Sequence, residues 1–389
     1  WEQRKLGEVF EQTSEYINPM EANLELFSLT VEKGLTQKTD RYNRSFLVKK
    51  EDKFKKVNPN DFVYNPMNMT LGAVGFNELG YSVAISGYYI TMKTTANWNN
   101  QFFRIWLSSP QAIHLYKLYA TGSLIEKQRV QFPNLSQIKM WVPSLEEQKK
   151  VGNFFKQLDE TIALYQERCE KLNKIKRAYL DLIFSQKIRF SSFSEEWELR
   201  NLDSLVERIK SYSLSRDVET SEYTGYKYIH YGDIHTKVAD IIDESSNLPN
   251  IKAGNYELLE KGDVVLADAS EDYQGIATPA VITIDTPYKL VAGLHTIALR
   301  PRQVDSFFLY YLINSSIFRR YGYKTGTGMK VFGISVKNLL KFESLIPPLE
   351  DQIKIGKFFK KLDENIDLHE KKLMKLNELK KAYLQKMFV

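Results

Sequence analysis

The residues that could carry out a reaction lie in three short segments, and none of them matches a catalytic or phosphate-binding pattern. Asn65–Asn68 reads Asn-Pro-Met-Asn and lacks the second proline and the aromatic residue of a DNA methyltransferase motif. Tyr323–Lys330 has the residue types of a phosphate-binding loop with the wrong spacing. The four acidic residues of Asp263–Asp272 could form a nuclease-like cluster, but the first half of the chain has no matching set. We therefore expect this chain not to be an enzyme by itself.

The composition excludes several other classes of protein. The chain has 389 residues, 43% hydrophobic and 26% charged, which is typical of two or three folded domains. No apolar run approaches the roughly 20 residues of a membrane span, so we expect a cytoplasmic protein with no membrane partner. One cysteine cannot form an internal disulfide, and five scattered histidines argue against a metal site. The net charge of +6 is compatible with nucleic acid without requiring it.

The elements that would position a site occur twice. Pro143–Phe184 matches Pro347–Phe388 at an offset of 204 residues, with 22 identities in 42 positions. Upstream, the loop Tyr119–Ser123 matches Tyr323–Thr327 at the same offset. Such a repeat indicates internal duplication, and the divergence between the matching segments suggests one scaffold with two different recognition surfaces.

The heads of the two repeats also match, Trp1–Leu6 against Trp197–Leu202, at an offset of 196 residues. The second repeat therefore carries about eight extra residues before Tyr323. Phe193–Glu196 precedes the second head and has no counterpart before Trp1, so we expect the natural protein to start upstream.

The matching segments predict two long helices with the same apolar seam. In both, apolar positions alternate at spacings of four and three and then slip by one residue, which is typical of a coiled coil. Ser144 and Glu147 form a predicted capping box at the first helix. The first seam contains Val151, Phe155, Leu158, Ile162, Tyr165, Cys169 and Leu172, then Ile175 and Tyr179; the second contains Ile355, Phe359, Leu362, Ile366, His369, Leu373 and Leu376, then Leu379 and Tyr383.

We predict an α+β protein in which two globular domains are separated by two long antiparallel coiled-coil helices, with pseudo-twofold symmetry. Shorter segments have strand or helix character: Ser82–Ser86 and Val281–Ile284 are predicted strands, and Pro110–Tyr119 and Phe307–Tyr321 predicted helices. The predicted parts are residues 1–142 (first globular domain), 143–186 (central helical spacer), 187–346 (second globular domain) and 347–389 (C-terminal helical spacer).

Two motifs, each present twice and in the same order, connect the chain to a known family. One is the head Trp-Glu-x-Arg-x-Leu at Trp1 and Trp197, and the other runs from Pro-x-Leu-Glu-[Glu/Asp]-Gln to Asp, at Pro143–Asp159 and Pro347–Asp363. Together they resemble the specificity subunit of type I restriction–modification enzymes over essentially the whole chain.

That resemblance implies a DNA-recognition subunit without catalysis of its own. Each globular domain would be a target recognition domain for one half of a bipartite, asymmetric sequence in double-stranded DNA, and the paired helices would set the gap between the halves. Two modification (methyltransferase) subunits and restriction (motor-nuclease) subunits would be the partners. S-adenosylmethionine, ATP and Mg would be bound by those partners, so no cofactor is expected in this chain.

Residues for DNA contact are chosen among loop side chains that can bind phosphates or base edges. The Thr-Gly loop of each repeat is the strongest choice, because glycine allows close approach of the backbone. The candidates in the first half are Lys38, Arg41, Tyr42, Arg44, Asn65, Asn68, Tyr88, Tyr89, Thr121, Gly122 and Ser123. The candidates in the second half are Tyr231, His235, Lys237, Ser270, Tyr273, Lys324, Thr325, Gly326, Thr327 and Lys330.

Three other functions remain open from the sequence. The chain could be the specificity subunit of another restriction–modification class with the same plan, a coiled-coil scaffold whose two domains bind proteins, or a stand-alone nuclease. Steep salt dependence would distinguish DNA binding from protein binding, because each neutralised phosphate releases counterions. Metal-dependent cleavage by the purified chain would identify a nuclease.

Overall fold

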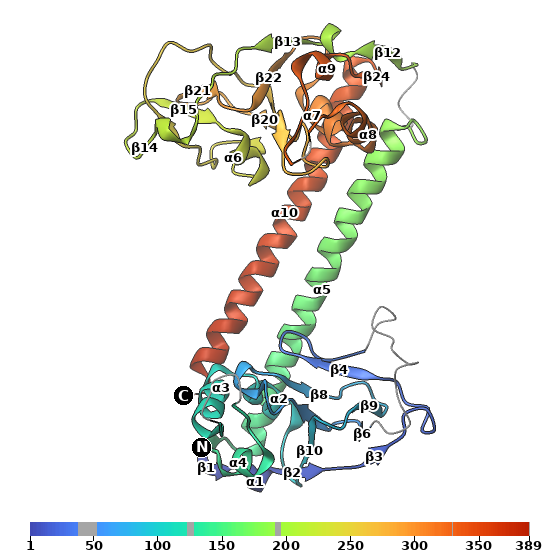
Figure 1. Cartoon of the computed structure of the whole chain (residues 1–389), viewed down its shortest axis with the longest axis vertical. Coiled ribbons are helices and arrows are strands. Elements are labelled where there is room, and N and C mark those ends of the chain that lie inside the picture. Colours follow the sequence, from blue (N-terminus) through green and yellow to red (C-terminus); the bar gives the residue numbers. More distant parts are fainter. Residues whose placement is uncertain (38–52, 123–127, 191–195, 329, 389) are drawn as a thin grey trace. The chain divides into compact units, whose positions relative to one another are not determined.

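The computed structural model describes residues 1–37, 53–122, 128–190, 196–328 and 330–388. It divides into two compact units, Trp1–Gln166 with Lys371–Val389 and Glu167–Glu370, which we call the first and the second unit. Each unit combines a globular α+β part with portions of two long helices, α5 (Leu145–Phe184) and α10 (Leu349–Lys386), which are each continuous in Figure 1. None of the helices in the described ranges combines the length and the apolar character needed to span a lipid bilayer.

In its described residues, the first unit is built from short antiparallel strands and four short helices. Its largest sheet has the order β2-β10-β7-β8, next to a three-stranded sheet β3-β6-β9 and the pairs β4-β5 and β1-β11. The strands are β1 (Glu2–Lys5), β2 (Phe10–Thr13), β3 (Tyr16–Ile17), β4 (Phe27–Thr30), β5 (Gly34–Gln37), β6 (Phe54–Val57), β7 (Phe62–Tyr64), β8 (Val74–Phe76), β9 (Val83–Ser86), β10 (Ile90–Thr94) and β11 (Lys139–Val142). The helices are α1 (Leu6–Val9), α2 (Asn100–Leu107), α3 (Pro110–Tyr119) and α4 (Phe132–Gln137), with a 3-10 turn η3 (Met69–Leu71).

The second unit has larger, mixed sheets. A five-stranded sheet has the order β13-β22-β18-β20-β16 and a four-stranded sheet the order β14-β17-β15-β21, with the pairs β12-β24 and β19-β23 beside them. The strands are β12 (Glu198–Asn201), β13 (Val206–Ile209), β14 (Glu219–Thr220), β15 (Tyr226–Ile229), β16 (Ile241–Ile242), β17 (Asn250–Ile251), β18 (Val264–Ala267), β19 (Ala269–Ser270), β20 (Pro279–Ile282), β21 (Lys289–Ala292), β22 (Thr296–Pro301), β23 (Phe332–Gly333) and β24 (Glu343–Ile346). The helices are α6 (Tyr231–His235), α7 (Ser306–Asn314), α8 (Ser316–Thr325) and α9 (Val336–Leu340), with 3-10 turns η5 (Leu202–Ser204) and η6 (Arg216–Val218).

One predicted helix is in fact two. Phe307–Tyr321 is broken at Ser315, whose backbone is extended and separates α7 from α8. Both the amide and the hydroxyl of Ser315 donate to the Leu312 carbonyl, so they satisfy the end of α7 instead of continuing it. Ser109 occupies the same place between α2 and α3 and caps α3 through its side chain.

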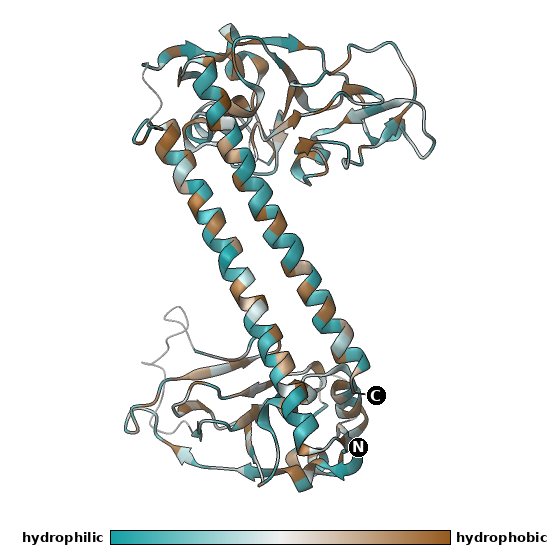
Figure 2. Ribbon diagram, turned by 180° about the vertical axis from the view of Figure 1, so that it is seen from behind, coloured by the Kyte–Doolittle hydropathy of each residue, from teal (hydrophilic) through white to brown (hydrophobic). Residues whose placement is uncertain are grey.

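The long helices run antiparallel within each unit, as predicted. In the first unit the Phe154 ring lies 5.1 Å from that of Tyr383, and in the second the Tyr179 ring lies 5.5 Å from that of Phe358. Figure 2 shows apolar residues recurring along both helices among hydrophilic ones. The predicted capping box is present, since Ser144 N and Glu147 Oε2 are 3.1 Å apart and Glu147 N and Ser144 Oγ are 3.3 Å apart.

After the slip the predicted seam is partly exposed. Tyr179, Leu379 and Tyr383 keep 39%, 43% and 38% of their surface accessible, although the Tyr179 and Tyr383 rings contact the opposite helix. Leu180, Ile183 and Phe184 enter the core of the second unit in place of Tyr179. The globular part covers this end of α5, so its packing, not the heptad pattern, selects the buried face.

A buried glutamine joins each long helix to its globular part. Gln148 is 1% exposed; its Nε2 donates to the Pro143 carbonyl at 2.9 Å and its Oε1 accepts from Asn99 N at 3.0 Å. Gln352 makes the equivalent bonds to Pro347 and Asp305, both at 2.8 Å. Asn99 and Asp305 in turn cap α2 and α7. The glutamine of the repeated motif is therefore a structural connection between helix and domain.

Candidate nucleic-acid interface

An aromatic group in the second unit surrounds the loop that follows α8. The Tyr273 ring lies 4.0 Å from that of Phe332 and 4.8 Å from that of Tyr323, centroid to centroid. Tyr323 is 65% exposed. Thr327 exchanges backbone hydrogen bonds with Gly333 at 3.0 and 2.9 Å, which closes the loop beside these rings. The arrangement presents flat apolar faces next to exposed backbone.

A second group of rings, formed by Tyr231, His235 and His295, lies next to strand β19. The Tyr231 ring lies 5.3 Å from that of His295 and 6.1 Å from that of His235. His235 Nε2 is 2.8 Å from the carbonyl oxygen of Ala269 in β19, and His295 Nδ1 is 3.1 Å from Asp268 Oδ1. Since β19 pairs with β23, the structure brings the predicted residues Tyr231, His235, Tyr273 and Thr327 to one region.

Arg319 supports the loop that carries Tyr273. Its Nη1 donates to the carbonyls of Gln274 at 2.9 Å and Ile276 at 2.6 Å. Burial lowers the pKa of Arg319 to about 10, which still leaves the guanidinium charged at neutral pH. Arg319, His295 and Tyr323 were not among the residues predicted for DNA contact, because no sequence motif marks a side chain that supports a loop through its carbonyl groups or one that is exposed.

The other predicted residues of the second unit fall into two classes. Lys237, Lys324 and Lys330 are exposed, as a phosphate contact requires. Ser270 is buried, and its Oγ accepts from Asp272 N at 3.3 Å, so its side chain shapes the loop instead of facing solvent.

The loop correspondence between the units is shifted by two residues from the one that the sequence suggests. Thr325 is the last residue of α8, its hydroxyl donates to the Tyr321 carbonyl, and Gly326 N donates to Gly322 O. In the second unit, Thr327 forms an isolated β-bridge and is followed by Gly328 at φ +136°. In the first unit, Thr121 forms the corresponding β-bridge and is followed by Gly122 at φ +124°. Thr-Gly occurs twice in residues 325–328, and the additional identity of Tyr119 with Tyr323 favoured the copy that lies two residues too early.

In the first unit two of the predicted loops are adjacent. Thr121 exchanges backbone hydrogen bonds with Arg129, and the next amide, of Val130, donates to the Pro66 carbonyl at 3.0 Å. The Asn65–Asn68 segment is a turn in which Asn65 Oδ1 accepts from Met67 N, and Asn68 is exposed.

Tyr88 and Tyr89 lie between β9 and β10, with their rings 6.2 Å apart. Tyr88 is exposed, whereas Tyr89 is half-buried and its carbonyl accepts from Lys55 Nζ. Five predicted residues lie outside the described ranges: Lys38, Arg41, Tyr42, Arg44 and Ser123.

The acidic stretch of the second unit is occupied by internal contacts. Asp263 pairs with Arg300 at 2.9 Å, Asp268 with His295, and Asp272 Oδ1 accepts from Gly275 N at 2.7 Å. Within the described part of the chain, no group of three or more His, Cys, Asp or Glu side chains is placed to hold a metal ion.

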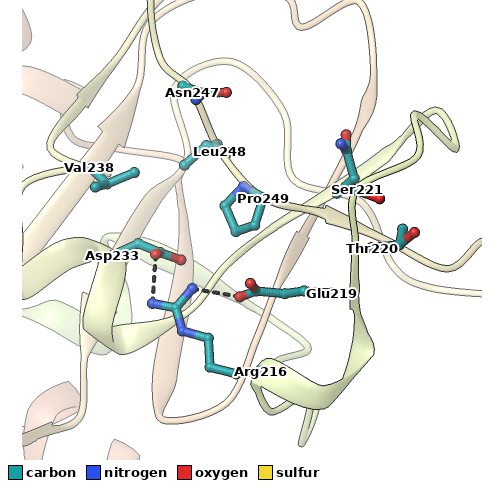
Figure 3. Close-up of a pocket in the computed structure, with 10 residues that line it drawn as sticks. Arg216, Glu219, Thr220, Ser221, Asp233, Val238, Asn247, Leu248 and Pro249 are labelled. Carbon is teal, nitrogen blue, oxygen red and sulfur yellow. Dashed lines mark hydrogen bonds and ion pairs between the residues drawn. The ribbon is translucent and has the colours of Figure 1, made fainter.

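A pocket of about 510 Å³ opens elsewhere in the second unit, beside Arg216 and Pro249 (Figure 3). The Arg216 guanidinium lies between Glu219 at 2.6 Å and Asp233 at 2.8 Å. Burial lowers the pKa of Arg216, but the hydrogen bonds and negative charges of these two carboxylates raise the pKa by more. With two carboxylates on one guanidinium, this pocket does not offer the positive charge that a phosphate would need.

The chain is similar to known proteins over both halves. Residues 1–174 and 194–378 each match the type I restriction modification DNA specificity domain. Two relatives from Methanocaldococcus jannaschii, the type I restriction enzyme MjaVIII specificity subunit and the putative type I restriction enzyme MjaX specificity subunit, are each 24% identical. The matches cover 64% and 68% of this chain but only 60% and 62% of those proteins, so the chain spans about three-fifths of their length.

Solved structures share the fold. The S subunit of the type I restriction–modification system from M. genitalium has a TM-score of 0.62 at 17% identity, covering 100% of this chain and 96% of the other. A chain from a structure on complex assembly and conformational transition of the type I R-M system has a TM-score of 0.54 at 16% identity, with 100% and 97% covered. Because the specificity domain matches twice and together covers most of the chain, this protein belongs to the family of type I restriction modification DNA specificity domains.

Proposed function

We propose that this chain is the DNA-recognition subunit of a type I restriction–modification complex. Its recognition domains, residues 1–142 and 187–346, each read one half of a bipartite, asymmetric target in double-stranded DNA. The helices α5 and α10 set the gap between the halves. The observation that carries the proposal is that both units keep the same glutamine connection and the same bridged Thr-Gly loop, while the sheets around the loop differ.

The chemistry of each loop suits contact with a duplex. The first unit offers Thr121 and Asn68, and the second offers Thr327, Tyr323 and three exposed lysines. Lysines position the protein on phosphates, whereas threonine, asparagine and tyrosine can contact base edges in a groove. Different surfaces on a common framework would read different half-sites.

The catalytic steps belong, in this proposal, to other chains. Two modification subunits would bring S-adenosylmethionine and methylate adenine, and restriction subunits would use ATP and Mg to translocate and cleave DNA. The chain itself would bind no cofactor and would act in the cytoplasm.

A map of methylated adenines in the source cell, with and without this gene, tests the proposal. We expect a split motif with two defined halves and one fixed gap to disappear on deletion. An unchanged map, together with DNA binding by the purified chain that does not weaken with salt, would reject DNA recognition. Several phosphate contacts predict a fall in log K of about 0.9 per contact against log salt concentration.

A domain exchange tests the division of labour. Replacing residues 5–140 with those of another family member should change one half of the motif only. Loss of both halves in a complex that still assembles would contradict independent reading by the two domains.

A further inference from the structure

Two aspartates occupy equivalent places on the long helices. Asp159 on α5 and Asp363 on α10 are 204 residues apart, the offset that relates the two repeats. Each pairs with a lysine of the other helix: Asp159 Oδ1 lies 2.6 Å from Lys380 Nζ, and Asp363 Oδ1 lies 2.5 Å from Lys176 Nζ. All four side chains are half-buried, where solvent screens a pair less than at the surface.

Each aspartate also contacts the globular part of its own unit. Asp159 Oδ2 lies 3.5 Å from Arg104 Nη1 of α2, and Asp363 Oδ2 accepts from the Tyr311 hydroxyl of α7 at 2.9 Å. Burial and the charge of Asp363 raise the pKa of Tyr311, so its phenol stays protonated. One carboxylate therefore connects three elements in each unit: its own helix, the antiparallel helix and the domain.

An apolar seam alone does not fix the alignment of two helices. A seam that repeats every seven residues offers similar packing after a slip of one heptad, and single polar contacts commonly specify the register. A slipped alignment would separate each half-buried aspartate from its lysine and leave both charges partly desolvated, which is unfavourable. The two ion pairs are thus suited to select one register.

We propose that Asp159 and Asp363 are positioning residues that restrict the gap between the two DNA half-sites. The inference rests on the proposed function and names the residues that determine its gap specificity. Each domain is fixed to the base of a different helix by Gln148 or Gln352, so sliding one helix along the other changes the separation of the domains. A slip of one heptad, about 10 Å, corresponds to roughly three base pairs of DNA.

The ion pair of the second unit allows a charge exchange. The exchange Asp363→Lys with Lys176→Asp keeps opposite charges, and the Tyr311 hydroxyl can accept from a lysine as readily as it donates to a carboxylate. In the first unit the same exchange would place a lysine against Arg104, so the second unit is the better test.

The assay uses the full chain co-expressed with its modification subunits and plasmids that carry the two half-sites at the native gap or at gaps one to three base pairs shorter or longer. The methylated fraction is measured for each plasmid. We expect the preference for the native gap to fall at least tenfold in Asp363→Lys and to return to within threefold of the unaltered chain in the exchanged double variant. Glu364→Lys is the matched control, because the Glu364 side chain is 62% exposed and pairs along its own helix with Lys360; it should keep the native preference.

Two results would overturn the inference: an unchanged gap preference in an assembled Asp363→Lys complex, or a loss of preference that the double exchange does not restore. If Asp363→Lys does not assemble, Asp363→Asn replaces it, because asparagine keeps an acceptor for Tyr311 and removes the charge. We expect Asp363→Asn to lower the preference for the native gap about threefold. An unchanged gap preference in Asp363→Asn would also contradict the inference. A merely structural role would lower the melting temperature without changing the preferred gap. Failure of the unaltered complex to methylate any plasmid would instead reject the proposed function.

Discussion

The glutamine that connects α5 to the first unit provides the sharpest stability test. Gln148→Leu keeps most of the side-chain volume and removes both hydrogen bonds. The substitution leaves the buried Pro143 carbonyl unpaired, which costs about 1–3 kcal/mol of stability. It also removes the partner of the part-buried Asn99 amide, which costs about 0.5–1.5 kcal/mol. The expected loss is therefore about 1.5–4.5 kcal/mol in the free energy of unfolding. For a unit of this size that corresponds to a fall of about 3–18 °C in melting temperature.

Thermal unfolding of the full chain, followed by circular dichroism, measures this loss. Gln157→Leu is the matched control, since Gln157 lies on the same helix and is exposed; we expect it to change the melting temperature by no more than about 2 °C, as surface substitutions usually do. If Gln148→Leu and Gln157→Leu unfold at the same temperature, the glutamine does not hold the helix to the domain and our account of the repeated motif is wrong.

Three further predictions concern recognition and pH. Tyr323→Ala removes an exposed ring, so it should leave the melting temperature unchanged and relax the bases read at one half-site only, by about 1–3 kcal/mol of discrimination in a methylation map. Inserting one heptad into either helix should lengthen the recognised gap by roughly three base pairs, because seven residues add about 10 Å; an unchanged gap would refute the helices as a spacer. Burial and the charge of Arg216 lower the pKa of His230 in the folded chain, so the unfolded chain takes up that proton first and stability falls as the pH drops below about 6.5. His230→Asn, which keeps a capping acceptor for Gly232 N, should flatten this part of a melting-temperature profile; an unaltered profile would remove His230 as its cause.

The long helices could be predicted because their signals are local. Ser144 and Glu147 are three residues apart, and their capping box depends on no other part of the fold. Likewise Pro110 and the preceding Ser109 start α3 where expected. The apolar seam of each long helix was correctly predicted up to the point where its spacing slips by one residue. In that part, the antiparallel partner is a helix with the same apolar pattern.

The prediction failed where a distant surface chose between local alternatives. Tyr179 continues the heptad and is exposed, because Leu180 and Phe184 face the core of the second unit. Thr325 and Thr327 are both followed by glycine, and only the end of α8 and the pairing with Gly333 decide which Thr-Gly forms the loop.

The duplication, the two helices, the family and the lack of a familiar catalytic motif could all be predicted from the sequence, since each depends on residues close together in the chain or on a comparison of its halves. Which side chains form the candidate interface depends on the tertiary structure. Tyr273 and Tyr323 lie together beside β23, which pairs with β19 across more than 60 residues, and Arg319 supports the Tyr273 loop through carbonyl groups that no residue type encodes. Base recognition depends on such loop geometry, and loop geometry is set by long-range packing.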